Sequence, residues 1–273
     1  MTCFRNSLLA AAASVSLALA PQAEAATVDL ELMLLTDASG SVDAADYALY
    51  IAGYAAAFRN AAVIQAITEG PIGQIAVAVG FFSDSSALGT AWTVISDAAS
   101  GEAFATAIEA MVRPFSGGTG IAQGINFAAA QFGTNGFDGT RQVIDVTIDG
   151  SENSALCNFD QPVCVPLQNA RDAALAGGVD AINALLISDP PFFGGPGNTI
   201  NATDYANTNI IGGAGSFATL VSDFSAFPGA IDAKILREIK PPGPAPVPLP
   251  AAGWLLIAGL GGLAALRRRR KAA

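Results

Sequence analysis

Three separate stretches of the sequence carry oxygen-bearing side chains of the kind that bind hard cations. The candidate ligands are Asp37, Ser39, Ser41, Thr119 and Asp149. The first three alternate within one segment, Asp-Ala-Ser-Gly-Ser; the fourth lies in the glycine-rich segment 116–120, and the fifth follows the apolar run 142–148. Carboxylates and hydroxyls bind Mg, Mn or Ca rather than soft metals. Since one loop supplies only part of a shell of about six oxygens, we expect the three stretches to meet.

Further acidic residues accompany this set, namely Asp84, Asp145, Glu152 and Asp189. Asp145 lies inside an apolar run. Its favoured role is a core carboxylate with a hydrogen-bond or ion-pair partner; the alternative is a residue that supports the metal ligands without contacting the ion. Two others begin loops, where solvated turn residues are the usual outcome. Glu152 and Asn153 follow Asp149 closely enough to border the site. Helix capping is the alternative role for the three hydroxyls.

The elements that must position these side chains alternate between apolar strands and amphipathic helices. We predict strands at residues 28–36, 75–82, 91–95, 142–148 and 180–187. We predict helices at 43–67, 104–112, 120–132, 167–176 and 217–239, the first capped by Ser41 or Asp43 and the last broken at Pro228. Residues 189–209 are predicted to form a long loop, either a recognition surface or a variable loop without a role.

This order of elements predicts the fold. Strands that are apolar on both faces and alternate with helices indicate an α/β fold, with a doubly wound, mostly parallel sheet and helices on both faces. Ligands of such sheets bind beyond the carboxyl ends of the strands. Asp37 and Asp149 each follow a predicted strand directly, so both lie where a ligand is expected.

Composition excludes several classes of function. The 273 residues contain no histidine, which rules out a Ser-His-Asp triad, a Cys-His pair and an imidazole-ligated metal site. The formal net charge is -10, and residues 27–240 hold 7 basic against 22 acidic side chains. Such a domain repels phosphate backbones, so we expect no nucleic-acid partner; a negative surface is compatible with cation binding.

The N-terminus has the features of a secretory signal. Residues 1–26 contain Arg5, an apolar stretch at 8–20 and then Ala23-Glu24-Ala25. The apolar stretch is shorter than the roughly 20 residues that span a membrane, so we predict a cleaved signal peptide and an exported protein. Cleavage leaves Cys157 and Cys164, which are predicted to form a disulfide in an oxidising compartment.

The C-terminus has the features of a membrane segment. A proline-rich spacer at 241–250 precedes an apolar stretch at 251–266, and basic residues follow at 267–271. The positive-inside rule places the basic end in the cytoplasm and the domain, residues 27–240, outside the inner membrane, in the periplasm. Residues 251–273 therefore form an apolar helix and basic tail that anchor or sort the protein.

The five candidate ligands resemble the metal-ion-dependent adhesion site (MIDAS) of von Willebrand factor type A (vWA) domains. Asp37, Ser39 and Ser41 match its DxSxS element, Thr119 its second-loop threonine and Asp149 its third-loop aspartate. The resemblance covers nearly all of the domain and extends to bacterial vWA-like proteins of unknown function. It implies a Rossmann-like fold in which the hydroxyls coordinate Mg or Mn, the aspartates hold waters, and an acidic side chain of a partner completes the shell.

The tail resembles the VPLPA-type sorting signals of exosortase substrates in Gram-negative bacteria. The motif is Val-Pro-Leu-Pro-Ala at 247–251, followed by the apolar segment and the arginine cluster. The resemblance implies that a membrane protease, an exosortase, cuts the tail and passes the domain to the outer envelope or the exterior. A permanent single-pass anchor is the alternative.

These observations favour an exported, non-enzymatic binding or adhesion protein that engages an acidic ligand through a divalent cation. One alternative is a metal-dependent hydrolase or phosphatase with Asp37 as nucleophile. Against it, phosphatases of the haloacid dehalogenase type require a second aspartate at position 39, where this chain has serine. The other alternative is a structural matrix component in which the metal only stabilises the fold.

Overall fold

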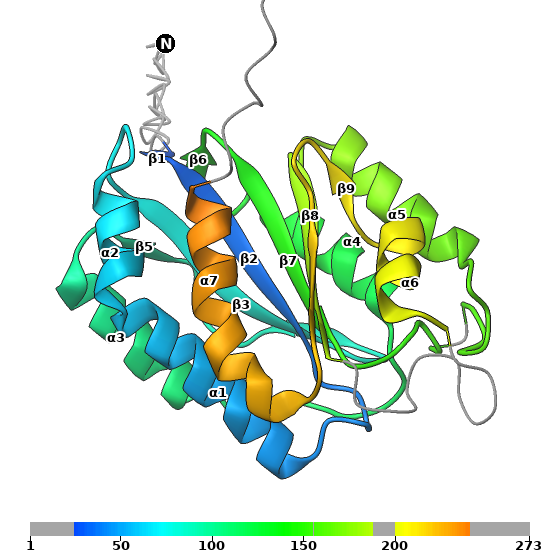
Figure 1. Cartoon of the computed structure of the whole chain (residues 1–273). Helices are drawn as coiled ribbons and strands as arrows, with labels where there is room; N and C mark the ends of the chain where they lie inside the picture. The colour runs from blue at the N-terminus through cyan, green and yellow to red at the C-terminus, as the bar shows by residue number, and fades with distance from the viewer. Residues whose placement is uncertain (1–24, 155, 188–199, 241–273) are drawn as a thin grey trace, which may run out of the picture.

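The computed structural model describes residues 25–154, 156–187 and 200–240 of the chain (Figure 1). Its centre is a sheet with the strand order β10-β8-β7-β2-β3-β4. Neighbours from β10 to β3 run parallel, whereas β4 and β5 pair with β3, and β9 with β8, in the antiparallel direction. The strands are β2 (Leu30–Asp37), β3 (Ile75–Phe82), β4 (Ser86–Leu88), β5 (Thr93–Ile95), β7 (Gln142–Ile148), β8 (Ala181–Ile187), β9 (Gly212–Gly213) and β10 (Ala218–Val221).

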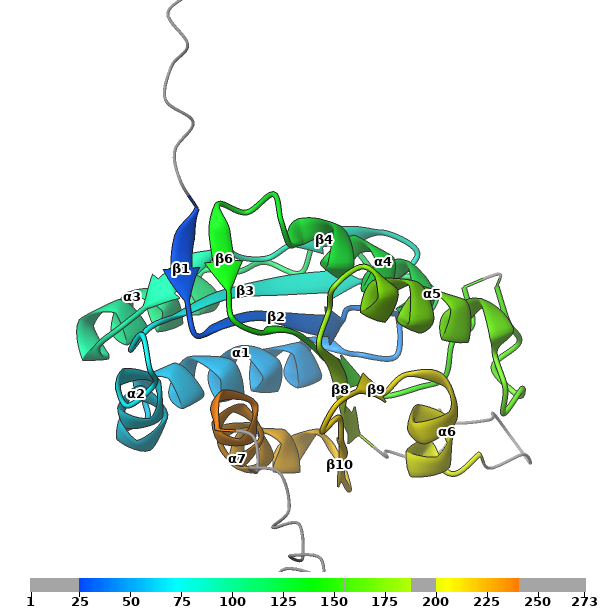
Figure 2. The same cartoon turned by 90° about the horizontal axis from the view of Figure 1, so that it is seen from above.

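Helices cover both faces of this sheet (Figure 2). One face is covered by α1 (Ala44–Arg59), α2 (Ala61–Thr68), α3 (Ala98–Glu109) and α7 (Phe227–Ile239), which follows the short 3-10 turn η1 (Phe224–Ala226). The other face is covered by α4 (Ile121–Gln131), α5 (Val165–Ala176) and α6 (Ala202–Asn209). A separate parallel pair is formed by β1 (Ala26–Val28) and β6 (Phe137–Gly139). None of the helices in the described residues is long and apolar enough to cross a membrane.

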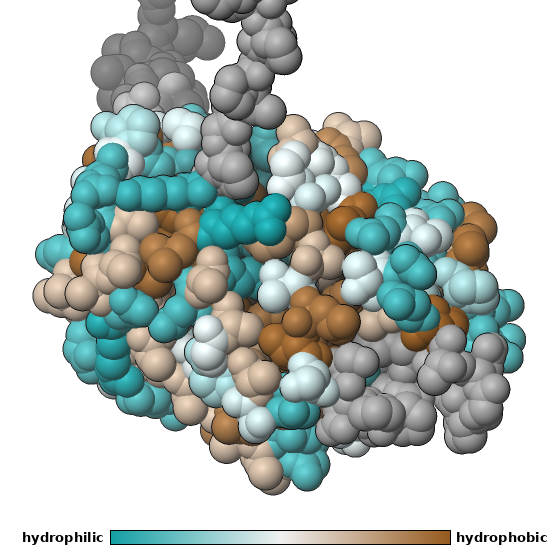
Figure 3. All heavy atoms as spheres, in the orientation of Figure 1, coloured by the Kyte–Doolittle hydropathy of each residue, from teal (hydrophilic) through white to brown (hydrophobic). Residues whose placement is uncertain are grey.

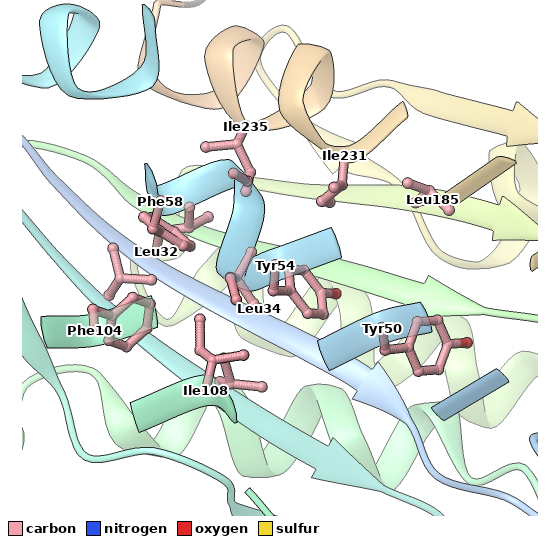
Figure 4. Close-up of a cluster of buried hydrophobic side chains, with 14 of the residues drawn as sticks. Leu32, Leu34, Tyr50, Tyr54, Phe58, Phe104, Ile108, Leu185, Ile231 and Ile235 are labelled. Atoms are coloured by element: carbon pink, nitrogen blue, oxygen red, sulfur yellow. The ribbon is translucent and has the colours of Figure 1, made fainter. Parts of the chain in front are cut away.

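The alternation of side chains along the central strands explains the two cores. On β2, Leu32 and Leu34 point to the face that carries α1 and α7, where they meet Tyr54 and Phe58 (Figure 4). Met33 and Leu35, which alternate with them along the strand, point to the face of α4 and α5. The fold is therefore the predicted α/β arrangement with a mostly parallel, doubly covered sheet.

Two sequence predictions were wrong in their secondary structure. Residues 217–239 do not form a broken helix, because β10 takes the first part and α7 the second. Pro228 does not break α7, since it lies in the first turn, where a missing N–H costs no hydrogen bond. Part of the predicted long loop is helix α6, which Asn201 caps by accepting from the Asp204 N–H. The apolar face of α6 is short, which hid the helix from pattern analysis.

Smaller differences concern breaks and short elements. The predicted helix 43–67 is divided at Asn60 into α1 and α2, and the predicted first strand is divided at Asp29 into β1 and β2. The short strands β4, β6 and β9 were not predicted. The spacer and apolar tail at 241–273 lie outside the described residues, as does the signal peptide except for its last two positions.

The surface in Figure 3 is mixed in character. Hydrophilic residues gather over α2 and the upper part of α7, and apolar residues lie between α7 and α6, where β10 forms the edge of the sheet. Leu220 of β10 is half exposed. Isolated apolar side chains of this kind are normal on soluble domains.

Beneath α7 lies a buried group of charges. The Lys234 ammonium pairs with Asp145 of β7 and, at 3.0 Å, with Glu238, and all three side chains are fully buried. Asn183 of β8 donates to Glu238 at 2.6 Å. Burial acts to lower the pKa of Lys234, but the charges of Asp145 and Glu238 raise it above its ordinary value. This group fastens α7 to the middle of the sheet.

We expect Lys234→Met to destabilise the protein by about 3–5 kcal/mol, because it leaves two buried carboxylates without their cation. The matched control is Lys240→Met, since Lys240 pairs with Glu69 at the surface, where both side chains are about half exposed. Denaturant unfolding of the two variants measures the difference. Equal losses of unfolding free energy in the two variants would show that the buried group does not fasten α7.

Candidate metal centre

The pairing of β2 with β7 brings the candidate aspartates to one edge of the sheet. Thr36 lies opposite Thr147 in the parallel ladder. The Tyr54 hydroxyl of α1 bridges these two threonines, with oxygen–oxygen distances of 3.0 Å to each. Asp37 ends β2 one residue later, and Asp149 follows the end of β7. The register of β2 and β7, whose last pair the Tyr54 hydroxyl bridges, therefore places both carboxyl groups at one edge of the sheet.

Hydrogen bonds link the aspartates to the two serines. The Ser39 N–H donates to Asp37 Oδ1 at 2.7 Å, and the Ser41 hydroxyl donates to Asp149 Oδ1 at 2.9 Å. The Ser39 and Ser41 hydroxyl oxygens are 3.0 Å apart. The Oδ2 atoms of Asp37 and Asp149 are both buried and receive no hydrogen bond from a donor in the described residues. Four of the five predicted ligands thus form one connected cluster.

Burial gives this cluster unusual electrostatics. Burial, and after it the charge of Asp149, raises the pKa of Asp37 well above its ordinary value. Burial likewise raises the pKa of Asp149 to about 6, although the hydrogen bond from Ser41 acts in the opposite direction. The buried hydroxyl of Tyr50 also has a raised pKa, because of burial and then the charges of Asp149 and Asp37. The cluster is a site of negative potential, which a proton or a metal cation neutralises.

Thr119 is joined to the cluster through the backbone. Its N–H donates to Asn153 Oδ1 at 2.7 Å, and the Asn153 N–H donates to the Thr119 carbonyl at 2.9 Å. The Gly40 N–H, between the two serines, donates to the Gly117 carbonyl at 2.8 Å. Each of the three loops therefore bonds to another, which places Thr119 beside the loops that hold the other four residues.

Helix capping does not account for the hydroxyls. Asp43 is the N-cap of α1, accepting from the N–H groups of Ala45 and Asp46, so the serines before it have no capping role. The N-cap of α4 is Gly120, and no side chain caps that helix. Within the part of the chain that the structure describes, the Thr119 hydroxyl makes one long contact, 3.5 Å, with Asn153 Nδ2. The Ser39 and Ser41 hydroxyls bond instead to each other and to Asp149.

The other predicted acidic residues lie around or away from the cluster. Asp84 is exposed and accepts from the Gly118 N–H at 2.9 Å, so it supports the loop of Thr119. Glu152 is buried and accepts from the Ala122 N–H at the start of α4. Asp145 pairs with Lys234 under α7, which is the core role. Asp189 lies outside the described residues.

Sequence analysis missed three residues that shape the site. Arg113 donates from Nη2 to the Ala38 carbonyl at 2.9 Å and also to the Ser39 carbonyl, which fixes the backbone between Asp37 and Ser41. Tyr54 bridges β2 and β7, and the buried Tyr50 is close enough to Asp149 and Asp37 for their charges to raise its pKa. Helical spacing marked Tyr54 only as part of an amphipathic helix and did not single out Tyr50, and nothing in the sequence distinguishes Arg113 from a solvated cation.

The residues present fit a hard divalent cation. The described residues contain no group of three or more His, Cys, Asp or Glu side chains able to hold a metal, so hydroxyls must supply part of any shell here. Two carboxyl groups and three hydroxyls on tied loops meet that requirement. The two buried carboxylate oxygens without donors need a proton or a cation, because an uncompensated buried charge is costly.

We expect Asp149→Asn to stabilise the cation-free protein at pH 7 by roughly 2 kcal/mol. The pKa of Asp149 is raised to about 6, above its unfolded value of about 3.9. Its contribution to stability is therefore full below about pH 4 and is lost as the pH rises through 6. Asparagine keeps an acceptor for Ser41 and has no charge to bury. Unfolding in a chelator from pH 4 to 7 measures the effect.

Asp43→Asn is the matched control with the opposite sign. Asp43 is exposed, and the backbone N–H groups of Asp46 and Ala45 lower its pKa, so its carboxylate contributes stability above its unfolded pKa. This contribution is lost as the pH falls through the lowered value. The Asp43 variant should therefore be less stable than the parent protein by an amount that hardly changes between pH 4 and pH 7. A gain for Asp149→Asn that does not change with pH would contradict the electrostatic account.

Comparisons with known proteins place the chain in a family. Residues 27–243 match the family described as "Protein of unknown function (DUF1194)". No functionally curated protein matches the sequence.

Similar solved structures show the fold. Proximal thread matrix protein 1 from the mussel byssus, in a form with a zinc-occupied MIDAS motif, is 16% identical with a TM-score of 0.55, over 79% of this chain and 49% of that chain. A von Willebrand factor type A protein from Catenulispora acidiphila is 14% identical with a TM-score of 0.53, over 78% and 43%. The chain thus spans about half the length of these proteins or less. The chain belongs to the DUF1194 family and has a vWA-like fold.

Proposed function

We propose that this protein is an exported binding or adhesion protein that engages an acidic ligand through a divalent cation. The cation would be held by Asp37, Ser39, Ser41, Thr119 and Asp149. The observation that carries the proposal is that Asp37 and Asp149 each keep one buried carboxylate oxygen without a donor in the described residues. The Ser41 hydroxyl bonds to Asp149 and to the Ser39 hydroxyl, and the Thr119 N–H bonds to Asn153 in the loop after β7. Export rests on the signal-like residues 1–26.

The arrangement suits ligand capture rather than a closed structural site. The serine and threonine hydroxyls would contact the ion, and Asp37 and Asp149 would compensate its charge directly or through water. When bound, the ion supplies an electrophilic position that accepts a carboxylate oxygen from outside. The two carboxylates of Asp37 and Asp149 carry together no more negative charge than a divalent ion carries positive charge. The loaded site is therefore not negative overall, and an external carboxylate still binds favourably.

The donor set favours Mg or Mn, with Ca as a further candidate. Zinc belongs in the same test, because the mussel protein of similar fold carries it in its MIDAS motif. The proposal is non-enzymatic. Asp37 is fully buried, and its Oδ1 accepts the Ser39 N–H, which makes it a poor nucleophile toward an external substrate.

A matrix role is the second candidate function. The observation that favours it is the fold shared with the mussel byssus protein, which is named as a matrix protein. In that case the ion stabilises the domain without contacting a partner. The C-terminal segment 241–273 is proposed to anchor the chain or to be cut by an exosortase, which would deliver the domain to the outer envelope or exterior.

The direct test is a cation titration of the full-length protein. Mg or Mn should raise the unfolding free energy, by about 2.7 kcal/mol when the free ion is at 100 times its Kd. Asp37→Asn and Ser39→Ala should abolish this increase, because each removes a group that the ion needs. Thermal unfolding with and without the ion, with Ca and Zn in parallel, measures it.

Asp43→Asn is again the matched control. It removes a carboxylate two positions from Ser41, but asparagine is also a good helix cap, and Asp43 is not one of the proposed ligands. This variant should retain the full stabilisation by the ion. A protein that no divalent ion stabilises, or equal responses in the Asp37 and Asp43 variants, would overturn the proposed site.

A further inference from the structure

An uneven distribution of exposed apolar side chains singles out one loop. In the described residues, the large apolar side chains that are exposed include Leu156 (48%), Phe159 (45%), Val163 (49%) and Val165 (56%). These four fall within ten consecutive residues, here called the rim loop, residues 156–165. The other exposed ones are scattered: Ile72, Leu88, Val112 and Leu220. A gathering of exposed apolar groups commonly marks an interaction surface.

The rim loop is held firmly, so its exposed side chains are displayed by a fixed backbone. A disulfide joins Cys157 to the fully buried Cys164, with the two Cα atoms 5.8 Å apart. Helix α6 holds the second half of the loop, because Asn209 donates to the Pro162 carbonyl at 2.9 Å and accepts from the Cys164 N–H at 2.8 Å. A loop fixed in advance loses little conformational freedom on binding.

The rim loop is continuous with the candidate metal centre. It begins three residues after Asn153, whose side chain accepts from the N–H of Thr119. The Ser151 hydroxyl, two residues after Asp149, donates to the Phe159 carbonyl at 2.7 Å. The segment between β7 and α5 runs along the edge of the sheet at which β2 and β7 end (Figure 1). A ligand bound at the cation would therefore extend over this loop.

We propose that the rim loop is the specificity surface of the cation site and that the partner is a polypeptide segment with apolar side chains beside its metal-binding carboxylate. This inference rests on the proposed function. It favours a polypeptide because a polysaccharide offers carboxylates without large apolar groups for these four side chains. Burying Leu156 and Phe159 against such residues supplies affinity that the ion alone does not.

The probe is a displayed peptide library with one fixed Asp and three randomised positions on each side. The full-length protein selects from it in Mn, and bound peptides are released with a chelator. Leu, Phe, Ile and Val should be enriched severalfold beside the Asp. For a selected peptide, Phe159→Ser or Leu156→Ser should weaken binding about tenfold or more, the effect of losing one buried apolar side chain.

Ile72→Ser is the matched control. Ile72 is exposed to 41% and precedes β3, so it lies at the opposite edge of the sheet, and its variant should bind the peptide like the parent protein. Cation-induced thermal stabilisation is measured in every variant. Because it depends on the metal ligands and on an intact fold, it should be unchanged by the three serine substitutions.

The outcomes separate this inference from the proposed function. Cation stabilisation without apolar enrichment, or with peptide affinity unchanged in the Phe159 and Leu156 variants, overturns the rim loop and leaves the metal site standing. Mn-dependent retention of polygalacturonate with no selected peptide also overturns it, because the partner would then be an acidic polysaccharide. Absence of cation stabilisation in the parent protein overturns both.

Discussion

The site depends on two carboxyl groups that the fold buries next to each other. The ladder between β2 and β7, which the Tyr54 hydroxyl bridges, leaves Asp37 and Asp149 at one edge of the sheet, each with an oxygen that no donor in the described residues reaches. Such an arrangement is unfavourable by itself, because both charges lose their hydration and repel each other. A proton relieves it in part, and a divalent cation does so more completely. The fold thus holds a local instability that the proposed cation would remove.

The remaining structure keeps the loops around these groups from relaxing. Arg113 fixes the carbonyls behind Ser39, the Gly40 backbone bonds to the loop of Thr119, and Asn153 joins that loop to the segment after β7. The same segment continues into the disulfide-closed rim loop, which α6 supports. One set of backbone contacts therefore positions both the proposed ligands and the proposed recognition surface, so ion binding and partner binding share a rigid frame.

Sequence patterns predicted what depends on local periodicity. The strands 75–82 and 142–148 and the mostly parallel sheet follow from continuous apolar runs, and the structure has them. The five proposed ligands were predicted from residue type, from the strands that precede Asp37 and Asp149, and, for Thr119, from a glycine-rich segment before a helix. The elements that were not predicted depend on tertiary contacts. Strand β10 forms because it pairs with β8, and helix α6 is too short to show a clear helical pattern of apolar residues. Arg113 acts through two backbone carbonyls, which leave no trace in sequence.

The central claim is that three loops form one pocket for a hard dication. Diffraction from a crystal soaked in Mn, recorded at a wavelength where Mn scatters anomalously, tests it most directly. The account predicts one strong anomalous peak within coordination distance of the Ser39, Ser41 and Thr119 hydroxyls, with Asp37 and Asp149 bound to it or to its waters. No peak there, or a peak that contacts the carboxylates while Thr119 remains remote, would contradict it.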